Sequence, residues 1–256
     1  MAIESTLKQL GNVREIQAAI FAAKDGDIIH VAPGRIQGRL VIDRPITVRG
    51  AGPDSTVIDG RGRGTTIAVE ASHGQVRLEE MSIVGGRSQS GGAVSIENGC
   101  EVHVVGCLVE KNTAKTGRGG AIAIDRGQLF VTECTIVDNQ AFAGGAIYAG
   151  GDAKVEIAAT IVAHNFAVRG GALAITDGAE VDVYTCRFEG NSAELEGHHV
   201  YTYGANRMRP LVLLSNAVLD TAPGGLPISN HHRFAASVAI DNSAVEREVA
   251  TPRVVG

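Results

Sequence analysis

The chain repeats one short phrase at a nearly constant interval, and this period constrains its fold more than any other feature. Two glycines, an alanine and an aliphatic residue begin at positions 91, 119, 144 and 170, which are 28, 25 and 26 residues apart. A degenerate fifth copy, Gly197-His198-His199-Val200, begins 27 residues later. A second phrase, an apolar residue followed three positions later by Asn, keeps step with the first and ends at Asn112, Asn139, Asn165 and Asn191. Self-similarity at a fixed period is typical of a solenoid.

Each repeat also carries the pattern of short β-strands. Aliphatic residues stand ten and eight positions before each Asn: Val102 and Val104, Leu129 and Val131, Val155 and Ile157, Val181 and Val183. Apolar residues two apart describe a strand with one buried face. The period is short, rich in β-branched residues and punctuated by Gly and Asn, which favours strands over helix. We therefore expect an all-β fold, a right-handed parallel β-helix of about eight coils stacked about 4.8 Å apart.

The recurring polar and small residues have structural explanations. A stacked Asn in every coil predicts a ladder of side-chain amides across a tight turn, with the left-handed backbone that Asn tolerates. The Gly pairs would permit a sharp turn before the next strand. Three of the four cysteines, Cys107, Cys134 and Cys186, stand five positions before an Asn and are expected to be buried thiols. A disulfide between two parallel inward thiols has poor geometry, and no cysteine pair has the spacing of zinc ligands.

The 256 residues are expected to form one β-helix domain. Residues 1–24 would be a polar leader and an amphipathic cap helix over 13–24, because Asn12 and Glu15 match a capping box. Residues 25–221 would form the coils, the last with Asn216 at the Cys position and Thr221 at the Asn position. Residues 222–256 would form a second cap, a tail or a segment lying across the side of the solenoid.

Charge and hydropathy exclude several classes of protein. The formal net charge is −5 and no basic stripe occurs, so nucleic acid is not an expected partner. No apolar run is long enough to span a membrane. The first residues do not form a secretion signal, so the sequence as written predicts a cytoplasmic protein, or a secreted or cell-surface one if an export segment has been removed. No cofactor is expected.

The run IQAAIFAAKDGDIIHVAPGRIQGRLVIDRPITVRGAG, from Ile16 to Gly52, resembles the opening of pectin-lyase-like β-helix proteins. The later repeats resemble the GGAI and FxxN repeats of chlamydial polymorphic outer-membrane proteins, although only Phe188 keeps the aromatic residue. The resemblance covers roughly residues 13–221 and implies a β-helix. It also implies a choice among polysaccharide lyases and hydrolases, periplasmic copper-accessory proteins and adhesin passengers, which fold alone does not decide.

A strip of small residues is the main candidate for a binding surface. If Val94, Ile122, Ile147 and Leu173 point inward, their neighbours point outward together with Ala93 and Ser95. The candidate binding residues are Ala121, Ala123, Ala146, Tyr148, Ala172, Ala174, His199 and Tyr201. Such a smooth face predicts a protein partner or a homo-oligomer, or else a cover formed by the C-terminal segment. An error of one residue would exchange the two faces.

Catalytic and metal sites are not expected from the sequence. Glu97 and Asp125 would stack on adjacent coils, but Gly150 and Thr176 then interrupt the column. Lyases and hydrolases need carboxylates clustered on one face, and three of them converging in one groove would contradict this interpretation. Adjacent histidines such as His198 and His199 point to opposite faces of a strand, so no metal site is predicted.

The favoured interpretation is therefore a non-catalytic β-helix scaffold or binding module with a flat side for a protein or a glycan. The alternative is a carbohydrate-active enzyme, a polysaccharide lyase or glycoside hydrolase. A metal-accessory role stands third.

Overall fold

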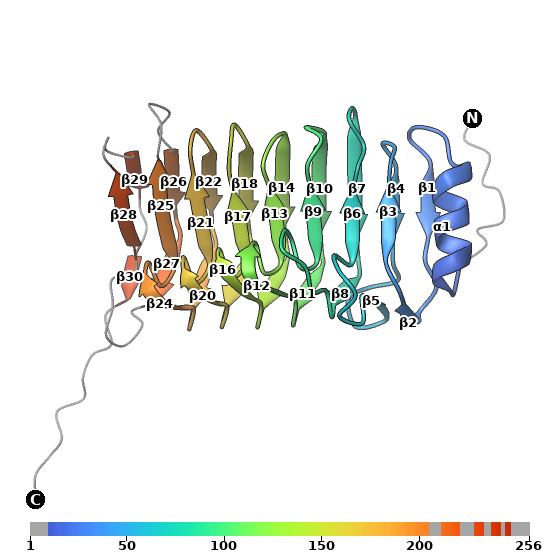
Figure 1. The fold of residues 1–256 in the computed structure, drawn as a ribbon, viewed down its shortest axis with the longest axis horizontal. Helices are drawn as coiled ribbons and strands as arrows, with labels where there is room; N and C mark the ends of the chain where they lie inside the picture. The colour runs from blue at the N-terminus through green and yellow to red at the C-terminus, as the bar shows by residue number, and fades with distance from the viewer. Residues whose placement is uncertain (1–9, 205–210, 221–227, 233–236, 242–243, 247–256) are drawn as a thin grey trace, which may run out of the picture.

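The computed structural model describes residues 10–204, 211–220, 228–232, 237–241 and 244–246. Within these residues the chain forms a parallel β-helix: coils of short strands stack along one axis, with a single helix at the N-terminal end (Figure 1). The predicted fold class is confirmed. The described parts of 222–256 do not lie across the side of the solenoid, because three strands within them extend its sheets by one further coil.

Three long sheets run the length of the solenoid. The back sheet contains β1 (Ile28–His30), β4 (Thr47–Arg49), β7 (Gln75–Glu79), β10 (Glu101–Val105), β14 (Gln128–Thr132), β18 (Lys154–Ala158), β22 (Glu180–Tyr184), β26 (Leu211–Ser215) and β29 (Ser237–Asp241). The lower sheet contains β2 (Gly34–Gln37), β5 (Thr56–Asp59), β8 (Ser82–Val84), β11 (Leu108–Glu110), β15 (Thr135–Val137), β19 (Ile161–Ala163), β23 (Arg187–Glu189), β27 (Val218–Asp220) and β30 (Ala244–Glu246). The front sheet contains β3 (Leu40–Ile42), β6 (Ile67–Val69), β9 (Val94–Ile96), β13 (Ile122–Ile124), β17 (Ile147–Ala149), β21 (Leu173–Thr176), β25 (Val200–Gly204) and β28 (Ile228–His232).

A fourth, shorter sheet lies between the lower and front sheets in each central coil. This rim sheet contains β12 (Thr113–Arg118), β16 (Gln140–Ala143), β20 (Phe166–Arg169) and β24 (Ser192–Glu196). Its strands follow the ladder Asn and precede the Gly pair, a stretch in which apolar and polar residues do not alternate. Ala114, Ala141 and Ala167 of the rim sheet are buried, while its other residues are half-buried or exposed.

The register stacks like residues on like. In the back sheet Val102 pairs with Leu129, which pairs with Val155 and then Val181, and all four are buried. The residues between them, from His103 to Asp182, face outward. Because every coil repeats this arrangement, one continuous apolar core fills the solenoid from Ile16 to Leu219.

The N-terminal helix α1 (Val13–Ala22) closes the first coil. The Asn12 side chain accepts a hydrogen bond from the Glu15 amide at 3.0 Å, so the predicted cap is confirmed. Ile16 and Ile20 enter the core. The Gln17 side chain donates to the Val41 carbonyl at 2.9 Å and accepts from the Val41 amide at 2.8 Å, as a neighbouring strand would. The helix therefore satisfies the exposed edge of the front sheet. No helix in the described residues is long and apolar enough to cross a membrane.

The predicted Asn ladder is present and buried. The Oδ1 of Asn139 accepts hydrogen bonds at 3.0 Å from the main-chain amide and the Nδ2 of Asn112, and Asn165 and Asn191 continue the same pattern. One detail of the prediction is wrong, because the left-handed backbone belongs to the residue before each Asn. Lys111, Asp138, His164 and Gly190 have φ of 56°, 57°, 53° and 59°. The residue with the left-handed backbone is therefore exposed in each turn, and the buried Asn does not have a positive φ.

A second ladder of thiol and hydroxyl groups runs beside the first. The Cys107 amide donates to Cys134 Sγ at 3.4 Å, and the Cys134 amide donates to Thr160 Oγ1 at 3.2 Å. All four cysteines are free and buried, and burial raises the pKa of the Cys186 thiol to about 11. In the last coil the sequence alignment is wrong by one residue: Arg187 pairs with Val218, so Ala217, not Asn216, follows Cys186 in this column. Thr221 lies outside the described residues.

The two glycines of each Gly pair are needed for different reasons. The first glycine of each pair, such as Gly144, has a φ near 68° that favours glycine. The second, Gly145, has no such angle, but a Cβ there would collide with the Gly171 carbonyl of the next coil. One glycine is required for the turn and the other for the close stacking of coils.

Candidate functional site

The structure divides the predicted strip of small residues between two environments. Ala121, Ala146 and Ala172 are completely buried in the main core, together with Ala93. The prediction that they face outward is therefore wrong. The strands β9, β13, β17 and β21 each begin at the residue after the alanine, so the two-residue alternation does not extend back into the turn.

His199 also points inward, against the prediction. It occupies the alanine position of the degenerate fifth copy and is 0% exposed. Its Nδ1 lies 3.3 Å from Nδ2 of Asn191, the last amide of the ladder, and its Nε2 lies 2.7 Å from the main-chain oxygen of Asp220. Burial lowers the pKa of His199, and the neighbouring Asp220 opposes that shift only in part. His199 fills the end of the ladder, and its Nε2 also lies 2.7 Å from Asp220 Oδ1.

The neighbouring His198 points the other way and accepts a hydrogen bond from the Ala193 amide at 3.0 Å. The expected divergence of the two histidines is therefore confirmed. In the described residues no group of three or more His, Cys, Asp or Glu is placed to hold a metal ion. The side chains of His231 and His232 lie outside what the structure describes.

The other half of the strip does lie on the outer face of the front sheet. Ser95, Ala123, Tyr148, Ala174 and Tyr201 pair in register across five successive coils. Ala123, Tyr148, Ala174 and Tyr201 form an outer cluster separate from the core, yet Tyr148 and Tyr201 are only 5% and 8% exposed. The row is therefore not the smooth exposed surface that was predicted, because the rim sheet overhangs it.

Two arginines from the rim sheet cover this row. The Arg118 guanidinium lies 4.6 Å from the centre of the Tyr148 ring, and its Nη1 donates to the Tyr148 hydroxyl at 2.8 Å. The Arg169 guanidinium lies 5.9 Å from the Tyr201 ring and 5.8 Å from the Phe142 ring. Cations over aromatic faces in this range are attracted by the ring electrons.

These groups enclose the tyrosine pocket, which has a volume of about 400 Å³. Its lining residues are Arg118, Phe142, Ala143, Tyr148, Arg169, Thr176, Tyr201 and Tyr203. Arg118 is also paired with Asp125 at 3.2 Å, and the Tyr148 hydroxyl contacts Thr176 Oγ1 at 2.7 Å. Arg169 differs, because it forms no ion pair with a described carboxylate and its buried Nε has no hydrogen-bond partner there.

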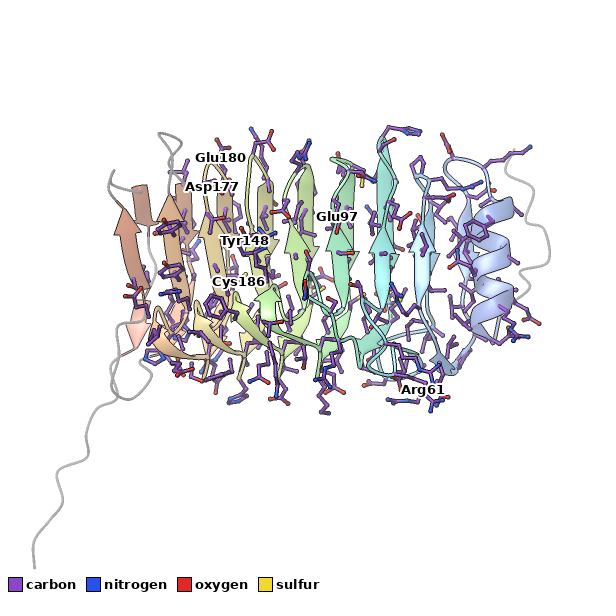
Figure 2. The ribbon with its side chains drawn as sticks, viewed as in Figure 1. Arg61, Glu97, Tyr148, Asp177, Glu180 and Cys186 are labelled. Carbon is purple, nitrogen blue, oxygen red and sulfur yellow. The ribbon has the colours of Figure 1, made fainter. Side chains whose placement is uncertain are left out.

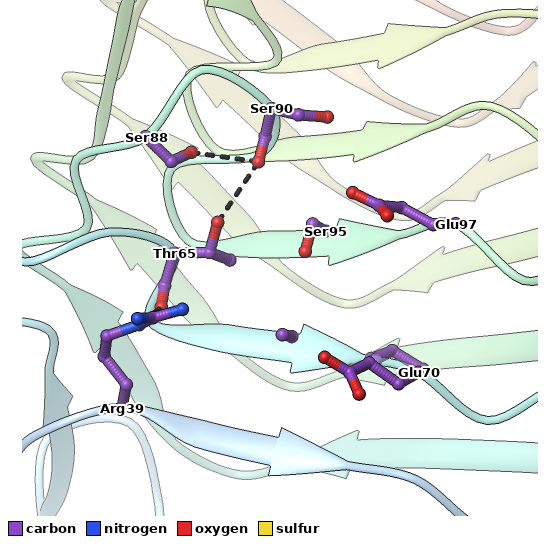
Figure 3. Close-up of a pocket in the computed structure, with 9 residues that line it drawn as sticks. Arg39, Thr65, Glu70, Ser88, Ser90, Ser95 and Glu97 are labelled. Atoms are coloured by element: carbon purple, nitrogen blue, oxygen red, sulfur yellow. Dashed lines mark hydrogen bonds between the residues drawn. The ribbon is translucent and has the colours of Figure 1, made fainter.

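A second cavity, the serine pocket, lies on the same face nearer the N-terminus and has a volume of about 310 Å³. Its walls come from β6, β9, the segments on either side of them and the residue before β3: Arg39, Thr65, Ala68, Val69, Glu70, Ser88, Ser90, Ser95 and Glu97. Figure 3 shows Arg39 at one side, Glu70 and Glu97 at the other and Ser95 between them. Glu97 and Tyr148 mark the positions of the two pockets along the front sheet (Figure 2).

The carboxylates of this face do not converge in one groove. Glu70 and Glu97 line the serine pocket, whereas Asp125, one coil further on, is bonded to Arg118. The expected interruption at Gly150 and Thr176 is present, and no carboxylate of the described residues lines the tyrosine pocket. The exposed Lys111 bonds Glu110 at 2.9 Å.

Sequence reasoning missed the arginines, which the structure makes the most prominent polar groups of the tyrosine pocket. Arg118 and Arg169 each stand immediately before a Gly pair, at the same point of two repeats. Extending the repeat alignment by one residue would have placed both at the edge of the strip. Their direction over the tyrosines depends on the rim sheet, which the pattern did not predict.

No family model and no curated protein matches this sequence. Solved structures do resemble the fold. A pectin methylesterase from Aspergillus niger matches with a TM-score of 0.59 and 14% identity, over 96% of this chain and 88% of that one. PemA from Erwinia chrysanthemi, also a pectin methylesterase, gives 0.60 and 11% over 94% and 92%. A pectin methylesterase solved with a hexasaccharide gives 0.59 and 12% over 96% and 91%. The chain has the pectin-lyase-like β-helix fold. Identities this low establish the fold alone.

Proposed function

We propose that this protein is a non-catalytic binding module for glycan chains, and that a chain lies across the front sheet with one sugar unit in the tyrosine pocket. The observation that carries the proposal is Arg169, a cation held against Phe142 and Tyr201 without a carboxylate partner in the described residues. Aromatic faces offer flat apolar contact while tyrosine hydroxyls and guanidinium groups offer hydrogen bonds. A sugar ring presents both kinds of surface.

The shape of the face favours a glycan over a second protein. The predicted protein partner or homo-oligomer required an exposed strip, and the row from Ser95 to Tyr201 is instead recessed under the rim sheet. Two pockets on one face of one sheet suit an extended, narrow ligand. Pectin methylesterases of the same fold have been solved with a hexasaccharide, which supports an oligosaccharide as the class of ligand.

The test is calorimetric titration with neutral and acidic oligosaccharides of four to six units. We expect Tyr201→Ala and Arg169→Ala to weaken binding at least tenfold, since both groups would contact the sugar. Tyr184→Ala on the back sheet should leave affinity unchanged. Equal losses from Tyr201→Ala and Tyr184→Ala would contradict the proposal, and light scattering with and without ligand would show whether a second copy of the chain occupies the face instead.

The serine pocket favours a second candidate, a carbohydrate-active enzyme, because two carboxylates line it. Paired carboxyl groups act as acid and base or nucleophile in glycoside hydrolysis. Incubation with polyuronates and neutral polysaccharides, with and without calcium, would be checked for new reducing or unsaturated ends. Product that disappears in Glu97→Gln would establish the enzyme and overturn the binding module.

The resemblance of the GGAI and FxxN repeats favours a location on the cell surface. The repeat phrases are similar to those of chlamydial polymorphic outer-membrane proteins, and a glycan-binding module would meet its ligand outside the cell. We therefore also propose a secreted or surface location. Fractionation with antibody detection is the test, and recovery of the whole pool from the cytoplasm would contradict it.

A further inference from the structure

We infer that the serine pocket is a second, separate subsite, which takes a sugar carrying a free protonated amine. The inference rests on the proposed function in one respect, that the ligand is a sugar chain. It concerns a different cavity from the tyrosine pocket. It depends on the negative charge of Glu70 and Glu97, whereas the proposed function depends on the positive charge of Arg169. Its evidence is the set of hydrogen-bonding groups that the pocket leaves unused.

The hydroxyl groups in the walls present acceptors to the cavity. Thr65 Oγ1 donates to the Ser90 carbonyl at 3.2 Å. Ser88 Oγ lies 2.9 Å from both the Ser90 and the Gly91 carbonyls. A hydroxyl carries one proton, and the Thr65 and Ser88 hydroxyls both donate it to the main chain. Toward the cavity they can therefore act only as hydrogen-bond acceptors.

Ser95 gives an independent indication of a ligand. Its residue is only 7% exposed, it lines the pocket, and its Oγ makes no hydrogen bond to any residue that the structure describes. The hydroxyl is therefore free to donate one hydrogen bond and to accept others from a ligand in the pocket. In Figure 3 Ser95 lies in the middle of the pocket floor, between the arginine and the two glutamates. A ligand in the cavity would complete its bonding.

Charge decides which ligand fits. Glu70 and Glu97 follow Val69 and Ile96, which pair across adjacent strands, so their main chains are about 4.8 Å apart. The Asn98 side chain ties the two turns together by donating to the Glu70 carbonyl at 2.9 Å. Neither carboxylate forms an ion pair with a described residue. Two like charges on neighbouring strands oppose each other, and a cation between them relieves that repulsion.

Arg39 sets the direction of the ligand. Its Nε donates to the Thr65 carbonyl at 2.7 Å, which fixes the guanidinium on the wall opposite the glutamates. A positive group at that wall repels an ammonium and favours hydroxyl oxygens. An amino sugar would therefore place its amine between Glu70 and Glu97 and its hydroxyl groups toward Arg39. Glu70 and Glu97 would repel the carboxylate of an acidic sugar on their side of the pocket.

The experiment compares a glucosamine tetramer with the N-acetylglucosamine tetramer of equal length by calorimetric titration, at a pH where the amine is protonated. We expect the free-amine tetramer to bind at least tenfold more tightly. Glu97→Gln and Glu70→Gln should each remove most of that preference, and Ser95→Ala should weaken binding several-fold. Glu180→Gln, an exposed carboxylate on the back sheet, is the matched control and should change nothing.

Each outcome separates this inference from the proposed function. Equal affinity for the two tetramers, or an equal effect of Glu97→Gln and Glu180→Gln, would overturn the amine subsite. If neutral and acidic chains then still bind through Tyr201, the proposed function stands without it. If no chain of any charge binds, both the proposed function and the amine subsite are contradicted. Persistence of the amine preference in Tyr201→Ala would support two separate pockets.

Discussion

Single buried polar residues hold the turns of this solenoid, and Asn139 is the clearest example. Its Oδ1 receives two hydrogen bonds from Asn112, while its Nδ2 reaches the Val109 and Val137 carbonyls at 2.9 and 3.0 Å. We expect Asn139→Ala to lower the free energy of unfolding by about 2–3 kcal/mol, since it leaves several buried groups unpaired. Denaturant unfolding is the measurement, with the exposed Glu156→Ala as the control. A loss within the roughly 0.5 kcal/mol of plain surface changes would contradict the role of the ladder.

His199 makes the C-terminal end of the ladder sensitive to pH. Burial depresses its pKa in the folded state below the value of about 6.5 in the unfolded chain. The unfolded state then binds more protons in this range, so stability is complete above about pH 6.5 and falls as the pH drops toward the folded pKa. We expect faster amide exchange in β24, β25 and β27 at pH 5.5 than at pH 7.5, after correction for the intrinsic rate. Identical protection at both pH values would be inconsistent with a neutral buried His199.

Glu79 responds to acid in a different range. Burial alone would raise its pKa, but hydrogen bonds and charges from Arg77 and Arg49, each 2.6 Å away, outweigh that effect and lower it. Its stabilising contribution is present above the unfolded value of about 4.3 and is lost as the pH falls through the lower folded pKa. Glu79→Gln should therefore flatten the stability profile below about pH 4 and leave the His199 step unchanged. Unfolding curves across pH test both points.

At the scale of elements, α1 depends on one side chain for its attachment to the front sheet. We expect Gln17→Ala to cost about 1–2 kcal/mol, because it removes both hydrogen bonds to Val41. Amide exchange in Val13–Ala22 and Leu40–Ile42 should rise. Arg14→Ala, an exposed change on the same helix, is the control, and similar exchange in the two variants would show that apolar packing alone holds the helix.

The strands and the helix could be predicted because each follows from a local pattern. The pairs Val102 and Val104 or Leu129 and Val131 define buried faces, and Asn12 with Glu15 defines the start of α1. The rim sheet could not be predicted, since β12 (Thr113–Arg118) has the mixed sequence of a loop and forms a sheet only by pairing with the next coil. The same limit applies to the site. Tyr148 and Tyr201 were found from their register, but Ala121 and His199 were misplaced because alternation fails at a turn.

On the scale of the whole molecule, the four coils that carry a ladder Asn are bonded to one another through the same set of groups. The ladder Asn of one coil donates to the next and accepts from the one before. We expect a protein with the segment 91–118 duplicated to fold, since a second Asn112 can bond to the first as Asn139 does. Circular dichroism and a denaturation midpoint at or above that of the parent would confirm it. An unfolded product would show that coils are not interchangeable.

The stacked coils also set the distance between the two pockets. The serine pocket draws on strands up to β9, and the tyrosine pocket begins with Arg118. The separation between the two pockets can thus change only in whole steps of about 4.8 Å, one for each coil gained or lost between them. Ligand length would then be selected in discrete increments. Recombination between repeats would give related proteins that differ in the distance between the two pockets, without altering either pocket.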